Sequence, residues 1–247
     1  MTTKNIVEYW NNSTPMKFDD ERWSYEKKRG FRYGLQDYMH STFGFEKWKD
    51  KRVLEIGCGS GIDALEFARN GAIVTATDIT ENAVRLTMEL AKEAGFDLQV
   101  VKVPANRLPF ENSSFDCCFS FGVLHHIPNI SAVMDEIYRV LKPGGQFMGM
   151  VYNRDSLLFA YSIFYLHYRD GTDLDELASM YSERNIGCPY TKCYTKDEAK
   201  DLFGQWFRDV TVEVKYNTID TQTQRKVKLG LDDKWELGWH IIVKGIK

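Results

Sequence analysis

The sequence has few of the features that mark secreted, membrane or metal-binding proteins. Only 5 of its 247 residues are cysteines, and none stands in a CxxC pair. This usage argues against a disulfide framework and a zinc site, and predicts a reducing, cytoplasmic compartment. The longest apolar run, residues 157–166, is too short to span a bilayer. The first residues do not resemble a signal peptide, so we expect no stable membrane insertion.

The chain also lacks an excess of positive charge. Its 32 Lys and Arg against 35 Asp and Glu give a formal net charge of −3. This balance predicts no nucleic-acid partner and favours a small-molecule one. Aromatic residues, at 14%, are abundant. They indicate either an apolar pocket or an aromatic core, and the sequence alone does not choose between these. The oligomeric state is likewise left open.

Residues 51–152 alternate between short apolar runs and helix-like segments. This rhythm predicts an α/β fold whose mostly parallel sheet has helices on both faces. The first two apolar runs end at Gly57 and Asp78, and the helix-like segments end at Gly71, Gly95 or the Lys142–Gly145 turn. The predicted strands are 52–56, 72–77, 98–103, 115–121 and 146–152, and the predicted helices are 62–70, 80–94 and 131–141.

The flanking segments follow other patterns, and we expect all of them to belong to one domain, 1–247. Residues 1–50 predict helices that form an N-terminal lid or simply anchor to the core. Residues 153–194 predict a helical cap, because the run 157–166 is apolar all round and should be buried or face an apolar ligand. Residues 195–247 predict a helix opened by a Thr195–Glu198 capping box, then strands 210–216 and 240–244 paired antiparallel at a sheet edge.

The most informative segment is the glycine-rich turn after the first strand, Glu55-Ile-Gly57-Cys-Gly59-Ser-Gly61. Glycines allow close approach of the backbone to a ligand, and the next helix directs its first N–H groups toward it. Asp78 ends the second strand, where a carboxylate can accept hydrogen bonds from two ribose hydroxyls. Together these residues predict a nucleoside site.

Two residues argue against a dinucleotide in that site. A dinucleotide fingerprint, G-x-G-x-x-G, needs a glycine at the position of Ile62. The carboxylate of Glu55 would repel a pyrophosphate but suits a ligand that carries an ammonium and a sulfonium. The E-x-G-x-G-x-G arrangement resembles motif I of the class I S-adenosylmethionine (SAM) dependent methyltransferases.

Three further segments extend this resemblance in the family's order. They are Asn106-Arg-Leu-Pro-Phe110 with Asn112–Asp116, Ser120–Pro128, and Arg139–Gly145. The chain therefore resembles the type 11/25-like small-molecule methyltransferases of class I. The resemblance implies a Rossmann-like sandwich with a seven-stranded, mostly parallel sheet and an antiparallel edge strand, SAM as cofactor, and methyl transfer to a small molecule.

The resemblance also implies roles for individual residues. Glu55 would reach the amine of the cofactor, the glycine turn would shape its methionine pocket, Asp78 would hold its ribose, and residues on either side would flank adenine. The predicted cofactor-binding residues are Glu55, Gly57, Cys58, Gly59, Gly61, Asp78, Ile79, Ala105, Asn106 and Phe121.

Methyl transfer from a sulfonium needs alignment and water exclusion, and a base only when the nucleophile must lose a proton. His126 and then His125 are the candidate bases, although both are equally compatible with packing. Related polyprenyl-quinol O-methyltransferases bind a metal here through two glutamates and a His. Gly122 and His125 replace those glutamates, so we expect no metal.

An acceptor pocket is predicted from aromatic residues in the flanks. The candidates are Tyr25, Tyr33, Phe159, Tyr165 and Tyr190, each of which could instead serve core packing. The predicted function is methyl transfer to a small aromatic or apolar metabolite. Two alternatives remain: a nicotinamide-dependent oxidoreductase, opposed by Ile62 and Glu55, and a SAM-fold binding protein without turnover.

Overall fold

The computed structural model describes residues 3–13, 23–183, 187–218 and 235–247. Its centre is a seven-stranded sheet with the order β3-β2-β1-β4-β5-β7-β6. The first five strands in sequence run parallel, with Val53 beside both Val74 and Cys117 at the centre of the sheet. The strands are β1 (Arg52–Ile56), β2 (Ile73–Asp78), β3 (Gln99–Lys102), β4 (Phe115–Phe121), β5 (Leu141–Tyr152), β6 (Arg208–Lys215) and β7 (His240–Ile246).

The sheet confirms the expected fold class, including the antiparallel pairing at one edge. β7 runs antiparallel to both β5 and β6 and lies between them. The antiparallel strand is therefore one position in from the edge, and β6 is the outer strand. β5 begins at Leu141, five residues before the predicted start at 146, because Leu141 already pairs with Phe115 of β4. The register shifts between this pair and the next, Cys117 with Gln146, so the Lys142–Gly145 segment forms an irregularity within the strand.

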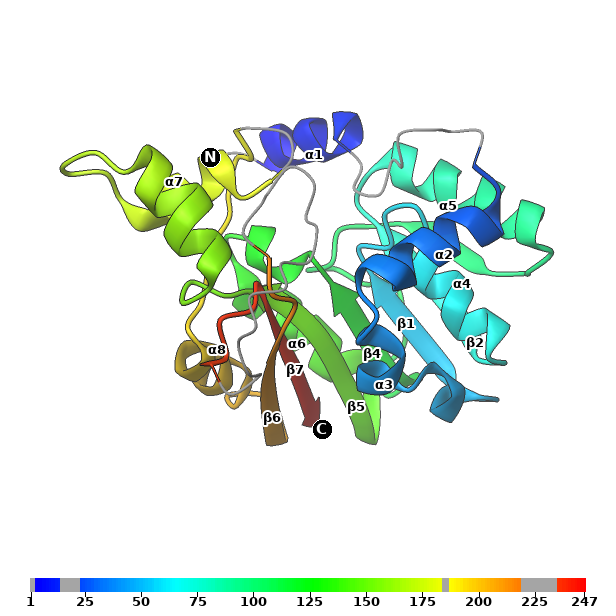
Figure 1. The fold of residues 1–247 in the computed structure, drawn as a ribbon. Coiled ribbons are helices and arrows are strands. Elements are labelled where there is room, and N and C mark those ends of the chain that lie inside the picture. Colours follow the sequence, from blue (N-terminus) through cyan, green and yellow to red (C-terminus); the bar gives the residue numbers. More distant parts are fainter. Residues whose placement is uncertain (1–2, 14–22, 184–186, 219–234) are drawn as a thin grey trace.

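Helices cover both faces of the sheet, and each face has its own apolar core (Figure 1). One core joins the sheet to α2 (Tyr25–Leu35), α3 (Met39–Phe43), η1 (Phe45–Trp48), α4 (Ile62–Arg69) and α5 (Glu81–Ala94). The other joins it to α6 (Ile130–Val140) and α8 (Lys196–Phe203). The predicted capping box of α8 is present, with Thr195 and Glu198 each accepting the other's backbone N–H.

Strand order reverses between β1 and β4, so the carboxyl ends of these two strands form a crevice. The glycine turn leaves β1 at this point, and η2 (Leu124–His126) follows β4. Figure 1 shows α1 (Thr3–Asn12) lying across this end of the sheet, and α7 (Leu174–Tyr181) lies in the same upper part of the view. The fold therefore brings segments that are far apart in the sequence to this end of the sheet.

The aromatic run in the predicted cap is only partly buried. It forms a π-helix, η3 (Phe159–Tyr165), in which Phe159 and Ile163 face the core. Tyr161 is 50% exposed and Tyr165 is 73% exposed, so this side of the run is not buried by the protein itself. The other alternative, that this side faces an apolar ligand, stays a prediction. Tyrosine tolerates such exposure because its hydroxyl remains hydrated. Among the described residues, none of the helices is long and apolar enough to cross a membrane.

Candidate active site

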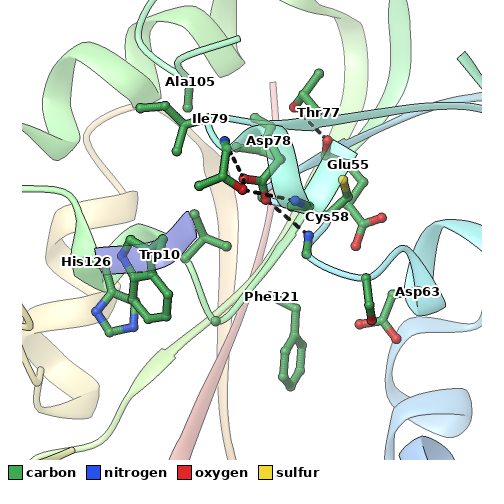
Figure 2. A pocket seen from close by; sticks show the side chains of 18 of the residues that line it. Trp10, Glu55, Cys58, Asp63, Thr77, Asp78, Ile79, Ala105, Phe121 and His126 are labelled. Carbon is green, nitrogen blue, oxygen red and sulfur yellow. Dashed lines mark hydrogen bonds between the residues drawn. The ribbon is translucent and has the colours of Figure 1, made fainter. Parts of the chain in front are cut away.

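A cavity of about 690 Å³ opens at the carboxyl ends of the central strands. Ligand pockets are typically about 300–1,000 Å³, so this one has room for a nucleoside and a small second molecule. Figure 2 shows two sides of it: Glu55, Cys58, Asp78 and Asp63 on one, and Trp10 with His126 on the other. Phe121 lies between them.

The glycine turn forms part of the cavity wall, but two of its glycines are also required by the protein's own packing. Gly57 has φ of +74°, and a Cβ there would lie 2.3 Å from Cγ2 of Val123. Gly61 has φ of +82°, and its Cβ would lie 2.7 Å from Cγ2 of Thr87. An L side chain at either position would therefore combine backbone strain with a clash. Close approach of a ligand is not needed to explain these two residues.

Glu55 is a buried carboxylate with an unsatisfied oxygen. The residue is 3% exposed, and Oε2 has no hydrogen-bond partner among the described residues. Burial raises its pKa well above the usual range, and the nearby charge of Asp63 raises it further. A buried acceptor without a donor is costly unless a ligand supplies the donor. Glu55 is therefore suited to a cationic N–H donor in the cavity.

Asp78 stands at the end of β2 and its carboxylate organises the neighbouring loops. One oxygen accepts the backbone N–H of Gly59 at 3.1 Å, and the other accepts the backbone N–H and the hydroxyl of Thr80, both at 2.9 Å. Burial raises the pKa of Asp78, and these hydrogen bonds oppose that rise. A carboxylate offers about four lone-pair sites, so capacity remains for a ligand hydroxyl.

Arg32 of α2 lines the cavity beside Asp63 of α4. Its Nε donates to Oδ1 of Asp63 at 3.1 Å and its Nη2 to Oδ2 at 2.6 Å. Tyr33 donates its hydroxyl to Oδ1 of the same carboxylate at 2.9 Å. Although burial opposes the charged form, Asp63 raises the pKa of Arg32, so the guanidinium stays charged. The cavity thus contains a fixed ion pair near Glu55.

His126 lines the other end of the cavity and is almost fully buried. Its Nδ1 lies 3.1 Å from the carbonyl oxygen of Tyr190 and 3.0 Å from Oγ1 of Thr191, and its Nε2 lies 3.4 Å from Oε1 of Glu183. Burial alone would lower the pKa of His126, but contacts with Cys188 and Glu183 outweigh it and raise the pKa to about 10.

The imidazole of His126 therefore has a defined tautomer when it is neutral. A main-chain carbonyl only accepts hydrogen bonds, so the proton belongs on Nδ1, facing Tyr190. The lone pair is then on Nε2, the nitrogen nearer to Glu183. Tyr152 holds that carboxylate in place, since its hydroxyl donates to Oε1 of Glu183 at 2.7 Å.

His125 has a different environment from its neighbour. It is fully buried, and its ring packs against that of Tyr152 with centroids 3.8 Å apart. Burial lowers its pKa well below the usual range, and the charges of His126 and His240 lower it further. The described cavity lining includes His126 but not His125. Of the two predicted bases, the structure therefore brings only His126 to the cavity.

Most of the predicted cofactor residues lie together in the cavity wall. Gly61 begins α4 behind the turn, and Asn106 is exposed outside the described lining. Binding of a cofactor by these residues remains a prediction. The predicted residues that do line the cavity are Glu55, Gly57, Cys58, Gly59, Asp78, Ile79, Ala105 and Phe121.

The five predicted acceptor-pocket residues lie outside the described lining of this cavity. Tyr25, Tyr33 and Phe159 are buried in the core on the α2–α4 face, where they pack between elements. Tyr165 is exposed, and Tyr190 is half-buried. Two of the five contact residues that line the cavity: the hydroxyl of Tyr33 donates to Asp63, and the backbone carbonyl of Tyr190 lies against His126.

Sequence reasoning missed several residues of the cavity, including Arg32, Gln36, Asp63, Tyr152, Glu183 and His240. The sequence contained one signal for Arg32 and Asp63. Arg29 and Arg32 are three apart on α2, and Asp63 and Glu66 are three apart on α4, so each arginine meets one acid. Glu183 and His240 carried no such signal, because only the fold brings them to the cavity.

A metal site is geometrically possible at one place in the described chain. One donor atom from each of His125, His126 and Glu183 lies within 4.8 Å of the others. Two of the three already have protein partners, since His126 contacts Tyr190 and Glu183 accepts from Tyr152. The expectation of no metal stays a prediction.

Comparison with known proteins identifies the core of the chain. Residues 54–149 match the family model described as a methyltransferase domain. A sterol 4-C-methyltransferase of Caenorhabditis elegans is 35% identical over 113 residues, which are 45% of this chain and 34% of that protein. A ubiquinone biosynthesis O-methyltransferase of Paracidovorax citrulli is 34% identical over 122 residues, 49% of this chain and 51% of that protein. The chain thus spans about half or less of these relatives.

The solved structures agree with this match in fold. A SAM-dependent methyltransferase of Methanosarcina mazei superposes with a TM-score of 0.60 at 25% identity, covering 81% of this chain and 93% of that one. The matched region contains the glycine turn, Asp78 and both candidate bases. The matched region, residues 54–149, is therefore a methyltransferase domain of the class I SAM-dependent type, whose cofactor is S-adenosylmethionine.

Proposed function

We propose that this protein transfers a methyl group from SAM to a small aromatic or apolar metabolite. The observation that carries the proposal is the unsatisfied oxygen of Glu55, which lies in one continuous cavity with Asp78, Trp10 and His126. That cavity joins a nucleoside-type site to a second lobe, as a reaction between two bound molecules requires.

The first lobe fits SAM by the chemistry of its side chains. Glu55 lacks a donor that the ammonium of the methionine moiety would supply. Asp78 retains acceptor capacity for ribose hydroxyls. Ile79 and Ala105 offer apolar contact to a base on the same side (Figure 2). When bound, SAM supplies an electrophilic methyl carbon on a sulfonium.

The second lobe supports an acceptor with apolar or aromatic character. Its described lining includes Trp10, Phe121, Met150 and Tyr152. The two relatives described above are named for acting on a sterol and in ubiquinone biosynthesis, and both names point to apolar molecules. Four carboxylates but only one arginine line the whole cavity as described, which disfavours an anionic acceptor.

His126 is the candidate general base for an acceptor that loses a proton. In its neutral form the lone pair of Nε2 would take the proton that the acceptor oxygen or nitrogen loses when it receives the methyl group that bound SAM would supply. Glu183 then stabilises the imidazolium from 3.4 Å away. Trp10 packs on the imidazole and helps to exclude water.

The free thiols support the proposed cytoplasmic location. All five cysteines are unpaired and buried. Buried free thiols are typical of proteins in reducing compartments.

A titration followed by an acceptor screen tests the proposal. SAM and its demethylated product, S-adenosylhomocysteine, should each raise the melting temperature and bind in calorimetry. Release of S-adenosylhomocysteine is then measured with phenols, quinols, sterols and amines, and an apolar phenol or quinol should give turnover. Absence of binding by either nucleoside, or tight binding of NADH instead, would overturn the proposal. Binding without turnover across the panel would favour a non-catalytic protein.

A further inference from the structure

His240 is a buried histidine of the cavity wall that neither the proposed cofactor contacts nor the proposed base uses. It begins β7, is 2% exposed and belongs to the described lining of the cavity. The sheet register places it opposite Tyr152, at the end of β5. Its ring also meets that of Phe121 edge to face, with centroids 5.4 Å apart. Tyr152 and Phe121 both line the same cavity, so His240 lies among the aromatic residues of the proposed acceptor lobe.

The imidazole of His240 is held in one orientation by its neighbours. The ring of Tyr216 is stacked on it, with centroids 4.7 Å apart and planes 14° from parallel. The hydroxyl of Tyr38, at the start of α3, lies 2.6 Å from Nδ1. Little further ordering is needed when a ligand binds to a group that is already positioned, so such a contact contributes well to affinity.

The contact with Tyr38 determines which ring nitrogen of His240 carries the proton. Burial raises the pKa of Tyr38 well above the usual range, so the phenol keeps its proton, and within the described ranges only His240 is placed to accept it. A buried donor without an acceptor is costly, so the hydroxyl donates to Nδ1. Burial lowers the pKa of His240 well below the usual range, and the charge of Arg32 lowers it further, so the ring is neutral. A neutral imidazole with an accepting Nδ1 has its proton on Nε2.

The Nε2–H group of His240 is left as a donor without a partner in the described part of the chain. Both ring nitrogens of His125 are closed off by protein and unpartnered, but Nε2 of His240 is not closed off in this way and is accessible from the cavity that the ring lines. The group that matches this donor is an oxygen of a bound molecule. Four carboxylates in the same described lining disfavour an anionic oxygen, so the matching oxygen is uncharged.

We propose that His240, held by Tyr38, donates a hydrogen bond from Nε2 to an uncharged oxygen of the methyl acceptor. The proposal rests on the proposed function, because it names a chemical feature of that acceptor. His240 is then a specificity-determining residue, which selects acceptors that carry an ether, carbonyl or hydroxyl oxygen in addition to the atom that is methylated. An acceptor with carbon in place of this oxygen would leave the N–H group unpaired and would bind less tightly for that reason.

The first test is the protonation of the two ring nitrogens of His240. Long-range proton–nitrogen NMR correlations of the full chain show which nitrogen of each histidine carries a proton, and the spectrum of His240→Gln identifies the signals of His240. The wild type should show a protonated Nε2 and a bare Nδ1. Tyr38→Phe, which removes only the hydroxyl, should shift the Nδ1 signal. A protonated Nδ1 in the wild type would overturn the proposal.

The second test compares acceptor probes that differ by a single oxygen. The probes are 2-, 3- and 4-methoxyphenol and the matched ethylphenols, in which a methylene group replaces the ether oxygen. Their affinities are measured with protein saturated with S-adenosylhomocysteine, so the result does not depend on turnover. Since an unpaired buried donor is costly, the wild type should bind at least one methoxyphenol about 5- to 100-fold more tightly than its ethylphenol. His240→Leu should lose this preference, and His240→Gln, which keeps an N–H donor, should retain part of it.

His167→Leu is the matched control, because it removes a histidine that is stacked on Tyr181 outside the described cavity lining. It should keep the preference for the methoxyphenol. A wild type that binds no methoxyphenol, or none more tightly than its ethylphenol, would overturn the proposal even if His240→Leu fails to fold. A preference that survives at full size in folded His240→Leu would overturn it as well. Failure of S-adenosylhomocysteine to bind would instead overturn the proposed function.

Discussion

Trp10 of the N-terminal helix packs against His126 at the end of β4, with ring centroids 4.6 Å apart. These residues are 116 positions apart in the chain, yet both line the cavity. The contact places α1 directly over the candidate base (Figure 2). α1 is therefore part of the site and not only a surface helix, which supports the lid proposed for this segment. Residues 14–22 of that segment lie outside the described residues.

Trp10→Ala should weaken acceptor binding more than cofactor binding. The indole covers His126 in the acceptor lobe, so its loss should raise the KM for the acceptor about tenfold, equivalent to about 1.4 kcal/mol. The Kd for SAM should change less than about threefold. Steady-state kinetics with the best acceptor and calorimetry with SAM measure the two effects. Trp10→Phe, which keeps an aromatic face, is the control and should retain most of the affinity. An equal loss for both ligands would contradict the assignment of Trp10 to the acceptor lobe.

The proposed cofactor lobe was predictable from the sequence because its residues come from short local patterns. Glu55, the glycine turn and Asp78 are each tied to the end of a strand, and parallel strands bring their carboxyl ends to one edge. Asn106 failed to reach the described lining because it is exposed in the loop after β3, where spacing does not set a side chain's direction.

The proposed acceptor lobe was not predictable in the same way. The residues assigned to it come from α1, β4, β5, β7 and the segment that follows β4, and only tertiary packing joins these elements. Aromatic residues in the flanks gave a misleading signal, because Tyr25 and Phe159 fill the core while Tyr165 faces solvent. Abundance of aromatic residues indicates buried apolar surface, but it does not say whether a ligand or the protein itself covers that surface.

Asp78→Asn should reduce SAM affinity while leaving the chain folded. The amide keeps one acceptor for Thr80 or Gly59 but loses the charge and the second acceptor for the ribose. A lost hydrogen bond to a charged group costs about 1.5–3 kcal/mol, so the Kd should rise about 10- to 100-fold. Calorimetry gives the affinity, and circular dichroism checks the fold. Thr80→Val, which removes one hydroxyl donor to the same carboxylate, should change the Kd far less. Unchanged affinity in Asp78→Asn would contradict the ribose assignment.

Glu55→Gln should stabilise the ligand-free protein and weaken SAM binding. The folded-state pKa of Glu55 lies above its unfolded value, so the folded wild type loses stability as pH rises from about 4.3 through the folded pKa. The variant lacks this penalty. Its stability advantage, about 1–3 kcal/mol, should appear at neutral pH and vanish below pH ~4. Urea unfolding at several pH values measures it.

Glu66→Gln is the control for Glu55→Gln, because it should change the stability at neutral pH in the opposite direction. Burial opposes ionisation of Glu66, but hydrogen bonds from Arg29 and His40 outweigh it and lower the pKa. The ionised group therefore stabilises the fold above its unfolded pKa, and that stability is lost as pH falls through the folded pKa. Glu66→Gln should be destabilised at neutral pH and approach the wild type in acid. Destabilisation of both variants at neutral pH would show that Glu55 is satisfied in the folded protein.

His126 should govern the pH dependence of methyl transfer. As a general base it is active only when deprotonated, and its pKa is raised to about 10 by Cys188 and Glu183 against the effect of burial. The rate should therefore rise with pH through the neutral range and level off near pH 10. Glu183→Gln removes a carboxylate 3.4 Å from Nε2, so the rising limb should move to lower pH. An acceptor that does not itself titrate between pH 6 and 10 keeps the profile interpretable.

Substituting His126 and His125 one at a time shows which of the two histidines acts as the general base. His126→Asn should reduce kcat by about 10²- to 10⁴-fold and abolish the rising limb, the usual loss on removal of a general base. His125→Asn should keep the limb, because His125 packs on Tyr152 outside the described lining, while its melting temperature falls. SAM affinity, measured by calorimetry, should be retained in both variants. A pH limb that survives in His126→Asn, or disappears in His125→Asn, would assign the proton transfer to another group.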